Sequence, residues 1–483
     1  MNKIAKKGTN TAKWNNMVKN GHRAVQIGDT KLAEATLEQY AMALRSAEGD
    51  SFREIAIRAF FDGFLYKTSE HSSVTGYSHN KLQWVQKDFW EKAGFTLVLE
   101  TDYGWTDMVP PKCMDMEIAL KEKISIYSTV SLFYKHKKSN DRVVVVISKN
   151  HHNNSFRYEV CYTGSDDFFK KWVELADQNN FYKGKKIDAD CRFLDLKNAS
   201  WEDVILNENQ KRVIQENITG LFSHNEVYKE FGIPIKRGII LHGPPGTGKT
   251  MCCKALAGQS QGYSVLYVLP RDFNPQLGGV ARIANMAQDL APCLLIIEDI
   301  DFIARDRELG NAGMVIELMN YLDGLEDFGD IVTFGTTNHL DIIEDAIKNR
   351  PGRFDRLIEI GKPELPEREA MIRLFTSRYV IQEDIGILSK KIGTKMSALT
   401  GSHIKDVCVT AAAAAARSGS IIENNGERKL LIKREHFKEA IAEVSNKNYA
   451  SYFEMQTKNS GAGVGFNQSK QKGLLTVGDD DDF

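Results

Sequence analysis

The stretch from His242 to Thr250, HGPPGTGKT, carries the residue types and the spacing of a phosphate-binding loop. Glycines let backbone N–H groups approach phosphate oxygens with no Cβ atom in the way. The apolar run Gly238–Leu241 predicts a strand before the loop. Met251–Gly258 predicts a helix after it, whose positive N-terminal end would face the same anion. This context completes the pattern G-x-x-x-x-G-K-[ST], so the sequence predicts a binding site for a nucleoside triphosphate.

Two side chains of this loop have chemistry of their own. We expect Lys249 to reach the β- and γ-phosphates and the Thr250 hydroxyl to coordinate Mg²⁺. The alternative is a surface turn rich in glycine and proline with a chance lysine, which the flanking strand and helix patterns disfavour. The residues expected to bind the nucleotide are Gly243, Pro244, Pro245, Gly246, Thr247, Gly248, Lys249, Thr250 and Met251.

Acidic residues follow a second apolar run further along the chain. The run Cys293–Ile297 has the length of a strand, and Glu298 and Asp299 come directly after it. Beside a P-loop, acids at the end of a buried strand are expected to hold Mg²⁺ through water and to polarise the water that attacks the γ-phosphate. The alternative is a strand end that is merely solvated, and the complete P-loop upstream argues against it.

Five segments resemble, in their order and spacing, the AAA family of ATPases: GIPIKRGIILHGPPGTGKT, LLIIEDID, LMNYLDGL, TTNHLD and NRPGRFDR. The resemblance covers about residues 201–447. Within the family the chain looks most similar to the subgroup containing the mitochondrial translocase of the Rieske iron–sulfur protein, because of its GIP-x-x-RG lead-in and its Glu-Asp acidic pair. The resemblance implies an α/β, RecA-like P-loop domain with a helical lid. It also implies ATP hydrolysis with Mg²⁺ and a homo-oligomer, usually a hexameric ring.

The resemblance assigns roles to residues outside the P-loop. Glu298 falls in the metal-binding position and Asp299 in the catalytic position, although the usual order in the family is Asp-Glu. Asn338 takes the sensor-1 place, where it orients the attacking water. Arg350 and Arg353 take the arginine-finger places and reach the γ-phosphate held by the neighbouring subunit, where guanidinium groups offset developing charge.

The chain departs from the family pattern in further places. The first pore loop normally shows an aromatic, a hydrophobic and a glycine residue, whereas this chain has Gln276-Leu277-Gly278, which does not favour threading of an unfolded peptide. The interval from Asn338 to Arg350 is one residue longer than usual. The Rieske-translocase subgroup is membrane-anchored, and no apolar run in this sequence approaches the ~20 residues of a membrane helix.

Composition favours a soluble protein of a reducing compartment. The chain has 483 residues, enough for roughly two to four domains. Its formal net charge is −1, so no global field attracts nucleic acid or an anionic membrane. Its seven cysteines show no C-x-x-C pair and no metal-ligand spacing, and we expect buried free thiols. The N-terminus lacks an apolar signal region, and we expect a cytoplasmic protein with no membrane contact.

The part of the chain before the ATPase segments shows no recognisable chemistry. Residues 1–50 have a helical pattern broken at Gly28 and Asp29, and we expect a helical hairpin there. Residues 51–197 mix helical periods with runs of period two, and we expect an α+β domain of unknown role. Residues 67–80 are polar and read as turns. The expected helices and strands are Ser51–Tyr66, Leu82–Ala93, Phe95–Leu99, Ile124–Tyr134, Arg142–Ser148, Phe156–Tyr162, Asp166–Asn179 and Asp188–Leu196.

The ATPase part is expected to comprise a large α/β domain, residues 198–364, and a helical lid, residues 365–447. In the family, Gly401 and Ser402 lie near the sensor-2 place and the adenine. The expected strands and helices are Ser264–Leu269, Cys293–Ile297, Ile331–Thr336, Ala312–Leu322, Glu367–Arg378, Ile385–Lys390 and Arg434–Val444.

The C-terminal tail, residues 448–483, has too little apolar surface to fold alone. It ends in four aspartates and Phe483. A solubilising end is one interpretation. The other is a partner-docking tail, because the ending resembles that of prokaryotic and phage single-stranded-DNA-binding proteins.

Three functions fit these observations. The first is an ATP-driven ring motor that remodels or moves a protein client recognised by residues 1–200. The second is a nucleic-acid motor or loader in replication or repair, which the tail favours and the near-neutral charge does not. The third is a nucleotide-gated scaffold that barely hydrolyses ATP, which the Glu-Asp order allows.

Overall fold

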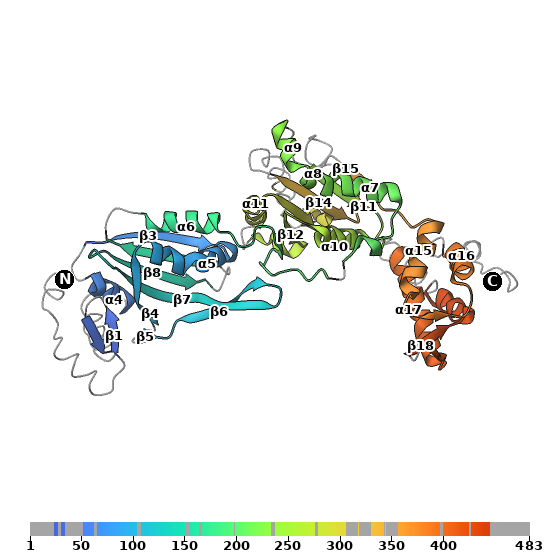
Figure 1. Ribbon diagram of the computed structural model, residues 1–483, viewed down its shortest axis with the longest axis horizontal. Helices are drawn as coiled ribbons and strands as arrows, with labels where there is room; N and C mark the ends of the chain where they lie inside the picture. The colour runs from blue at the N-terminus through green and yellow to red at the C-terminus, as the bar shows by residue number, and fades with distance from the viewer. Residues whose placement is uncertain are drawn as a thin grey trace, which may run out of the picture. The chain divides into compact units, whose positions relative to one another are not determined.

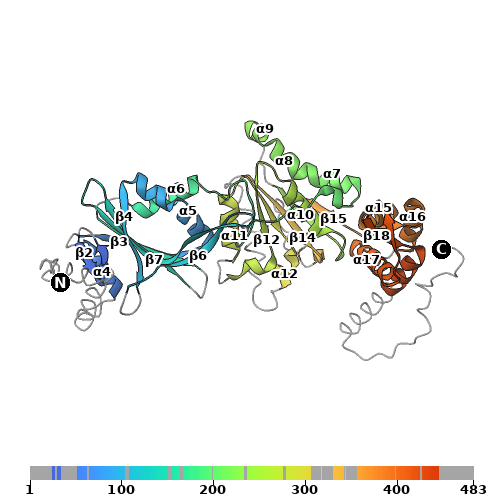
Figure 2. The same cartoon turned by 60° about the horizontal axis from the view of Figure 1, so that its bottom comes forward.

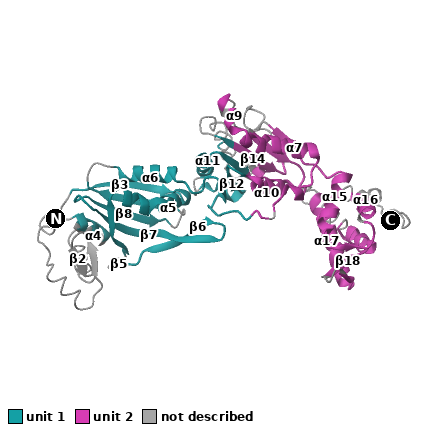
Figure 3. Cartoon of the chain, in the orientation of Figure 1, with its two compact units in different colours: residues 1–195, 261–296, 311–331 teal, residues 196–260, 297–310, 332–483 magenta. Residues whose placement is uncertain are grey.

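The structure is a computed structural model that divides into two compact units, shown in Figure 3. Unit 1 combines residues 1–195, 261–296 and 311–331, and unit 2 combines residues 196–260, 297–310 and 332–483. The residues that the structure describes are 24–27, 30–33, 52–61, 65–103, 108–150, 155–163, 167–197, 199–232, 237–275, 279–305, 317, 330–341, 343, 356–396, 399–424 and 427–444.

A seven-stranded sheet dominates the N-terminal part of unit 1 (Figure 1). Its strand order is β3-β9-β8-β7-β4-β5, and β6 pairs with β7 beside this path. All of the pairings are antiparallel. The strands are β3 (Lys67–Val74), β4 (Phe95–Tyr103), β5 (Met108–Val109), β6 (Lys112–Ala119), β7 (Glu122–His136), β8 (Arg142–Lys149) and β9 (Phe156–Tyr162).

Helices cover both faces of this sheet, which explains the continuous apolar run of β8. Val143, Val145 and Ile147 pack with residues of α5 (Gly76–Lys92) and α6 (Phe168–Gln178). Val144 and Val146 point to the opposite face and pack with α4 (Phe52–Phe61). Successive strand residues face opposite sides, so a strand covered on both sides is apolar throughout. The helices and strands predicted between residues 51 and 179 are present, with ends shifted by several residues in places.

Three predictions for unit 1 were wrong. Residues 67–80 were expected to be turns, but residues 67–74 form β3, an edge strand that pairs with β9. Most side chains of β3 are polar and exposed, so they do not show the alternating apolar pattern that predicts a strand. Within residues 1–50, where a helical hairpin was expected, the described residues form a β-hairpin, β1 (Ala24–Ile27) and β2 (Thr30–Ala33); the rest of this segment lies outside the described residues. Two residues, Gly28-Asp29, separate these strands, and a short connection beginning with glycine is a hairpin signal.

The third error concerns the strand expected at Asp188–Leu196. The observed strand β10 (Lys186–Asp188) does not join the antiparallel sheet of the α+β region but pairs in parallel with β12 (Ser264–Val268). It belongs to a six-stranded sheet of order β10-β12-β13-β14-β11-β15, in which β13 is Cys293–Ile297. Strand β12 is buried throughout, and β10 pairs through its backbone with the outer edge of β12.

Unit 2 holds the P-loop strand and its parallel neighbours. Strand β11 (Arg237–His242) lies between β14 (Ile331–Thr337) and β15 (Arg356–Glu359). Because parallel strands end at the same edge of a sheet, the segments after β11 and β14 lie close together. The helices of this part are α7 (Glu208–Asn217), α8 (Thr219–Ser223), α9 (Asn225–Glu230), α10 (Lys249–Gln259) and α12 (Ile300–Arg305).

The lid also lies in unit 2, and Figure 2 shows its helices grouped around β18. Its core joins residues of α15, α16 and α17 with Ile432, Phe437, Ala440 and Val444. Residues 434–444 are helical, as predicted. A three-stranded sheet, β16-β18-β17, adds strands that the sequence analysis did not expect. The elements are α15 (Leu365–Thr376), β16 (Val380–Ile381), α16 (Ile385–Lys395), α17 (Gly401–Arg417), β17 (Ile421–Asn424) and β18 (Glu427–Ile432).

The cysteines are free, as expected, and six of the seven are buried; Cys113 on β6 is exposed. Among the described residues, no helix is long and apolar enough to cross a membrane.

Candidate nucleotide-binding and hydrolysis site

Glycines are required at three positions of the loop that follows β11. Gly243, Gly246 and Gly248 have φ values of 146°, 79° and 107°, in the region that side chains rarely adopt. A Cβ atom on Gly243 would lie 2.1 Å from the carbonyl oxygen of Ile360. Gly248 is the N-cap of α10, and Lys249 and Thr250 open that helix. The backbone therefore has the conformation and the helix start that the P-loop pattern predicts.

The Lys249 ammonium lies inside this loop. Its Nζ donates hydrogen bonds of 2.8 Å to the carbonyl oxygens of Gly243 and of Pro244. Burial lowers the pKa of Lys249, and the carboxylates of Asp299 and Asp301 oppose that shift. Thr247 Oγ1 also donates to the Pro244 carbonyl, at 3.0 Å. A cation thus occupies the centre of the loop, with carboxylates near it.

Asp299 is held at the strand end in a strained conformation. Its φ is 46°, a left-handed value that is uncommon for a residue with a side chain and that clusters at functional sites. Its backbone N–H donates to Thr336 Oγ1 at 3.0 Å, and its Oδ1 accepts from Asn338 Nδ2 at 3.2 Å. Burial and the charge of Asp301 raise the pKa of Asp299, while Lys249 and the bond from Asn338 act in the opposite direction.

Asp301 is a fully buried acid that sequence reasoning did not single out. Its Oδ1 accepts from Thr337 Oγ1 at 2.9 Å and from the backbone N–H of Asn338 at 3.3 Å. These contacts fix the segment that carries Asn338 against the acidic segment. The sequence feature that could have pointed to Asp301 is the pair of hydroxyl residues at the end of β14. The hydroxyl of Thr336 contacts Asp299, and that of Thr337 contacts Asp301.

The other predicted residues have different outcomes. Glu298 directly follows β13 and is buried, at 8% exposure. The pKa of the nearby Cys253 thiol is raised mainly by burial and further by the charge of Glu298. Arg350, Arg353 and the loop Gln276–Gly278 lie outside the described residues, as do the tail and most of the helix expected at Ala312–Leu322. Within the described residues, no group of three or more His, Cys, Asp or Glu side chains is arranged to hold a metal ion.

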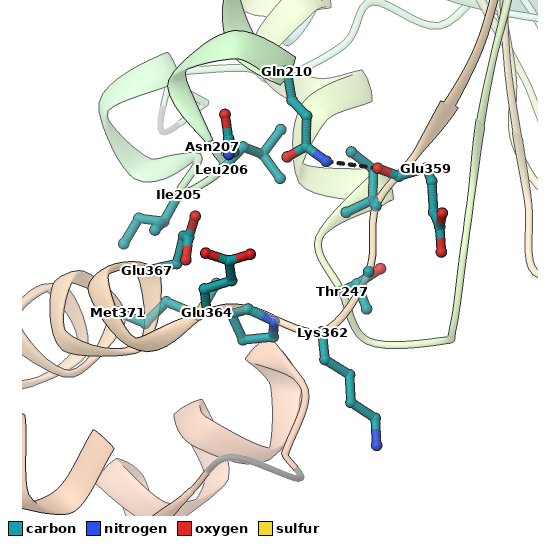
Figure 4. A pocket seen from close by; sticks show the side chains of 13 residues that line it. Ile205, Leu206, Asn207, Gln210, Thr247, Glu359, Lys362, Glu364, Glu367 and Met371 are labelled. Atoms are coloured by element: carbon teal, nitrogen blue, oxygen red, sulfur yellow. Dashed lines mark hydrogen bonds between the residues drawn. The ribbon is translucent and has the colours of Figure 1, made fainter. Parts of the chain in front are cut away.

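A cavity of about 330 Å³ adjoins the P-loop at Thr247 and is shown in Figure 4. Ile205, Leu206 and Met371 give it apolar walls, and Gln210 closes one side by donating from Nε2 to the Glu359 carbonyl at 2.6 Å. Its size lies within the ~300–1,000 Å³ range of ligand pockets. Sequence reasoning did not find this cavity because its walls come from three distant segments. The remaining lining residues are Asn207, Ile360, Gly361, Lys362, Pro363, Glu364 and Glu367.

The N-terminus of α17 meets the P-loop at the positions that the family resemblance placed near the nucleotide. The backbone N–H of Ser402 donates to the Gly246 carbonyl at 2.9 Å. A Cβ atom on Gly246 would lie 2.1 Å from Ser402 Oγ. Thr400 caps α17 together with His403, and its Oγ1 lies 3.1 Å from Ser402 Oγ. The lid and the phosphate loop are therefore in direct contact.

Comparison with known proteins identifies the class of this domain. Residues 239–362 match the model of the family "ATPase family associated with various cellular activities (AAA)". The chain therefore contains an AAA ATPase domain. The predicted fold class, a RecA-like P-loop ATPase domain preceded by an α+β region, is confirmed.

Among curated proteins, similarity extends to ATPases named for the proteasome. The proteasome-activating nucleotidase of Methanocaldococcus jannaschii is 29% identical over 286 residues, which are 57% of this chain and 63% of that protein. The 26S proteasome regulatory subunit 4 homolog of Saccharomyces cerevisiae is 31% identical over 252 residues, 50% of this chain and 55% of that protein. The proteasome-activating nucleotidase of Aeropyrum pernix is 33% identical over 231 residues, which are 46% of this chain and 56% of that protein. The chain thus spans between about half and two thirds of the length of these relatives.

Proposed function

We propose that the protein is an ATP-hydrolysing AAA motor that assembles as a ring and remodels or moves a protein client. The observation that carries this proposal is the convergence of Lys249, Asp299 and Asn338 after neighbouring strands, beside a cavity that Thr247 lines. Phosphoryl transfer needs three kinds of group, and this site holds all of them. They are a cation that binds the phosphates, a carboxylate that polarises the attacking water, and an amide that orients the carboxylate.

The donor set fits a nucleoside triphosphate and Mg²⁺. The two carbonyl bonds of Lys249 can be replaced by bonds to phosphate oxygens, which are stronger because the acceptor is charged. Thr250 and Glu298 would hold Mg²⁺, which keeps several waters and needs only one or two protein ligands besides phosphate. The ion, when bound, offsets negative charge on the phosphate oxygens. The cavity beside Thr247 would take the base, between the apolar side chains of Leu206 and Met371.

Asp299 would act as the general base. The Asn338 amide holds its Oδ1, so one oxygen is fixed in direction and the other can accept a proton from water. A raised pKa makes this carboxylate a stronger base than an ordinary aspartate. Asp301 would position Asn338 through its backbone N–H rather than contact the reacting atoms.

We further propose a homo-oligomer, most simply a hexamer, in which Arg350 and Arg353 reach the nucleotide of the neighbouring subunit. This rests on the resemblance of NRPGRFDR to the AAA pattern. It explains why hydrolysis would require assembly, since an isolated pocket lacks the guanidinium groups that offset charge in the transition state.

A protein client is favoured over nucleic acid because the relatives quoted above are named for the proteasome. We propose that residues 51–197, without β10, recognise the client, and that residues 198–364 with β10 form the large ATPase domain and residues 365–447 the lid. Membership of the Rieske-translocase subgroup is part of the proposal and rests on the lead-in GIP-x-x-RG and the Glu-Asp pair. The free, mostly buried thiols support a reducing compartment such as the cytoplasm.

Steady-state ATPase rates test the proposal against its alternatives. The full chain and Lys249→Ala are compared, each with and without single-stranded DNA. Turnover that DNA does not change and that Lys249→Ala abolishes supports the protein motor. Strong stimulation by DNA would favour a nucleic-acid motor instead. Tight ATP binding with almost no turnover would favour a nucleotide-gated scaffold.

A further inference from the structure

A buried lysine joins the α+β region to a helix of the ATPase region within unit 1. Lys81 lies on α5 and is 5% exposed. Its Nζ donates to Asp177 Oδ1 of α6 at 2.6 Å and to a carboxylate oxygen of Asp289. Asp289 is the last residue of α11 (Gly279–Asp289). Asp177 belongs to the same region as Lys81, whereas Asp289 lies more than two hundred residues further along the chain.

The ring of Tyr77 completes the surroundings of this ammonium group. Lys81 Nζ lies 5.0 Å from the centroid of the Tyr77 ring, within the range of a cation–π contact. The Tyr77 hydroxyl accepts from Asn180 Nδ2 at 2.6 Å. Burial, with the charge of Asp289 nearby, raises the pKa of Tyr77 far above its ordinary value, so the ring stays neutral. The lysine charge is therefore balanced by Asp177 and Asp289, one from each of the joined regions.

The other end of α11 is also tied to the N-terminal side of the chain. Arg282, in the first turns of the helix, donates from Nη1 to the Ala189 carbonyl at 2.8 Å and from Nη2 to the Asp272 carbonyl at 2.9 Å. Ala189 directly follows β10, and Asp272 lies in the short helix η2 (Pro270–Phe273). Helix α11 is thus held near both ends by contacts inside unit 1.

Helix α11 lies next to a segment of the chain that the ATPase cycle is expected to move. The helix begins directly after Gln276–Gly278, the residues assigned by sequence to the first pore loop. Any movement of α11 that accompanies nucleotide binding would act on Lys81 through Asp289, because separating this pair removes one of the two acids bonded to an ammonium group that is almost completely buried. Asp289 also interacts with the Tyr77 hydroxyl, so both of these contacts of Asp289 reach the same helix, α5.

We propose that Lys81 is a positioning residue that, through Asp289, makes α11 and α5 move together and so transmits nucleotide-dependent movement to the α+β region. This rests on the proposed ATPase motor and adds the route by which its cycle reaches the region proposed to recognise the client. The Lys81–Asp177 pair holds the lysine in place, and the Lys81–Asp289 pair carries the coupling.

Hydrogen exchange of the full-length protein, with and without a non-hydrolysable ATP analogue, tests the coupling. Asp289→Asn removes the acid on α11, and Asp177→Asn is the matched control, because it removes an acid of the same kind that lies within the α+β region. Lys81→Arg keeps the positive charge. Binding of the analogue is measured separately by calorimetry, and basal ATPase is measured for each protein.

In the wild type, Asp177→Asn and Lys81→Arg, the analogue should change exchange in both α11 and α5. In Asp289→Asn the change in α11 should remain and the change in α5 should fall at least twofold, with affinity for the analogue and basal turnover unchanged. Equal transmission in Asp289→Asn and Asp177→Asn would overturn the coupling, as would a wild type that binds the analogue with no change in α5. A wild type that does not bind the analogue would overturn the proposed function and the transmission that rests on it.

Discussion

Replacing Asp299 by asparagine tests the assignment of the general base with little disturbance of the site. The amide oxygen of an asparagine can still accept the 3.2 Å bond from Asn338 Nδ2, and the backbone bond to Thr336 does not involve the side chain. Asparagine also tolerates the left-handed φ of 46° at this position better than most residues. The substitution therefore removes the basic oxygen while leaving the geometry in place.

The size of the effect follows from the role. A positioned general base contributes typically ~10²–10⁴-fold, so kcat for ATP should fall by about that factor while affinity for ATP stays within a few-fold. The pH profile gives a second readout. The base acts only when ionised, and burial with the neighbouring Asp301 raises the pKa of Asp299, so wild-type turnover should fall on acidification at a pH above the ordinary aspartate value. Asp299→Asn should lose this acidic limb.

Steady-state kinetics, calorimetry with an ATP analogue and Mg²⁺ titration measure these quantities. Glu298→Gln is the matched control, since it neutralises the preceding acid and should raise the Mg²⁺ concentration needed for half-maximal rate. If Glu298→Gln instead traps bound ATP without turnover, while Asp299→Asn only shifts the Mg²⁺ optimum, the two roles are reversed and the reasoning from the Asn338 contact is wrong.

Three further outcomes are expected. Lys249→Ala should weaken ATP binding by at least tenfold in calorimetry, because it removes the ammonium at the centre of the loop; unchanged affinity would contradict the P-loop assignment. Gly246→Ala should weaken ATP binding and lower the melting temperature, because the new Cβ would lie 2.1 Å from Ser402 Oγ. Gly262→Ala is the control: Gly262 has the same φ of 79° but no atom within 4 Å of the added Cβ. This control should show only the backbone strain of ~1–2 kcal/mol, with ATP affinity unchanged. Arg350→Ala subunits, inactive alone, should regain part of their ATPase when mixed with Lys249→Ala subunits, since intact pockets then meet intact fingers; mixed rings without activity would show that the arginines do not act between subunits.

The sequence could predict the features that depend on residues close together in the chain. The P-loop, the acidic pair after Cys293–Ile297 and the buried strand β8 each follow from a short run of residue types. Strand β3 could not be predicted in this way, because a solvated edge strand is stabilised by its backbone pairing with β9 and not by an apolar pattern.

Features made by distant residues also escaped prediction. The cavity beside Thr247 forms where Leu206, Gln210 and Met371 meet, and no local pattern records that meeting. The role of Asp301 depends on its bonds to Thr337 and Asn338, which exist only after β14 is paired in the sheet. Likewise β10 was assigned to the wrong sheet, because its partner β12 lies about 80 residues away in the chain.

The distribution of cysteines makes the native chain convenient for spectroscopy. Burial raises the pKa of Cys161, Cys191, Cys252, Cys293 and Cys408 to about 12 and that of Cys253 well above its ordinary value, so none of these thiols supplies appreciable thiolate at neutral pH. The remaining thiol, Cys113, is exposed on β6. A maleimide dye or spin label should therefore attach at one defined point of the α+β region of the unmodified protein, and report its movement during turnover without any cysteine having to be replaced.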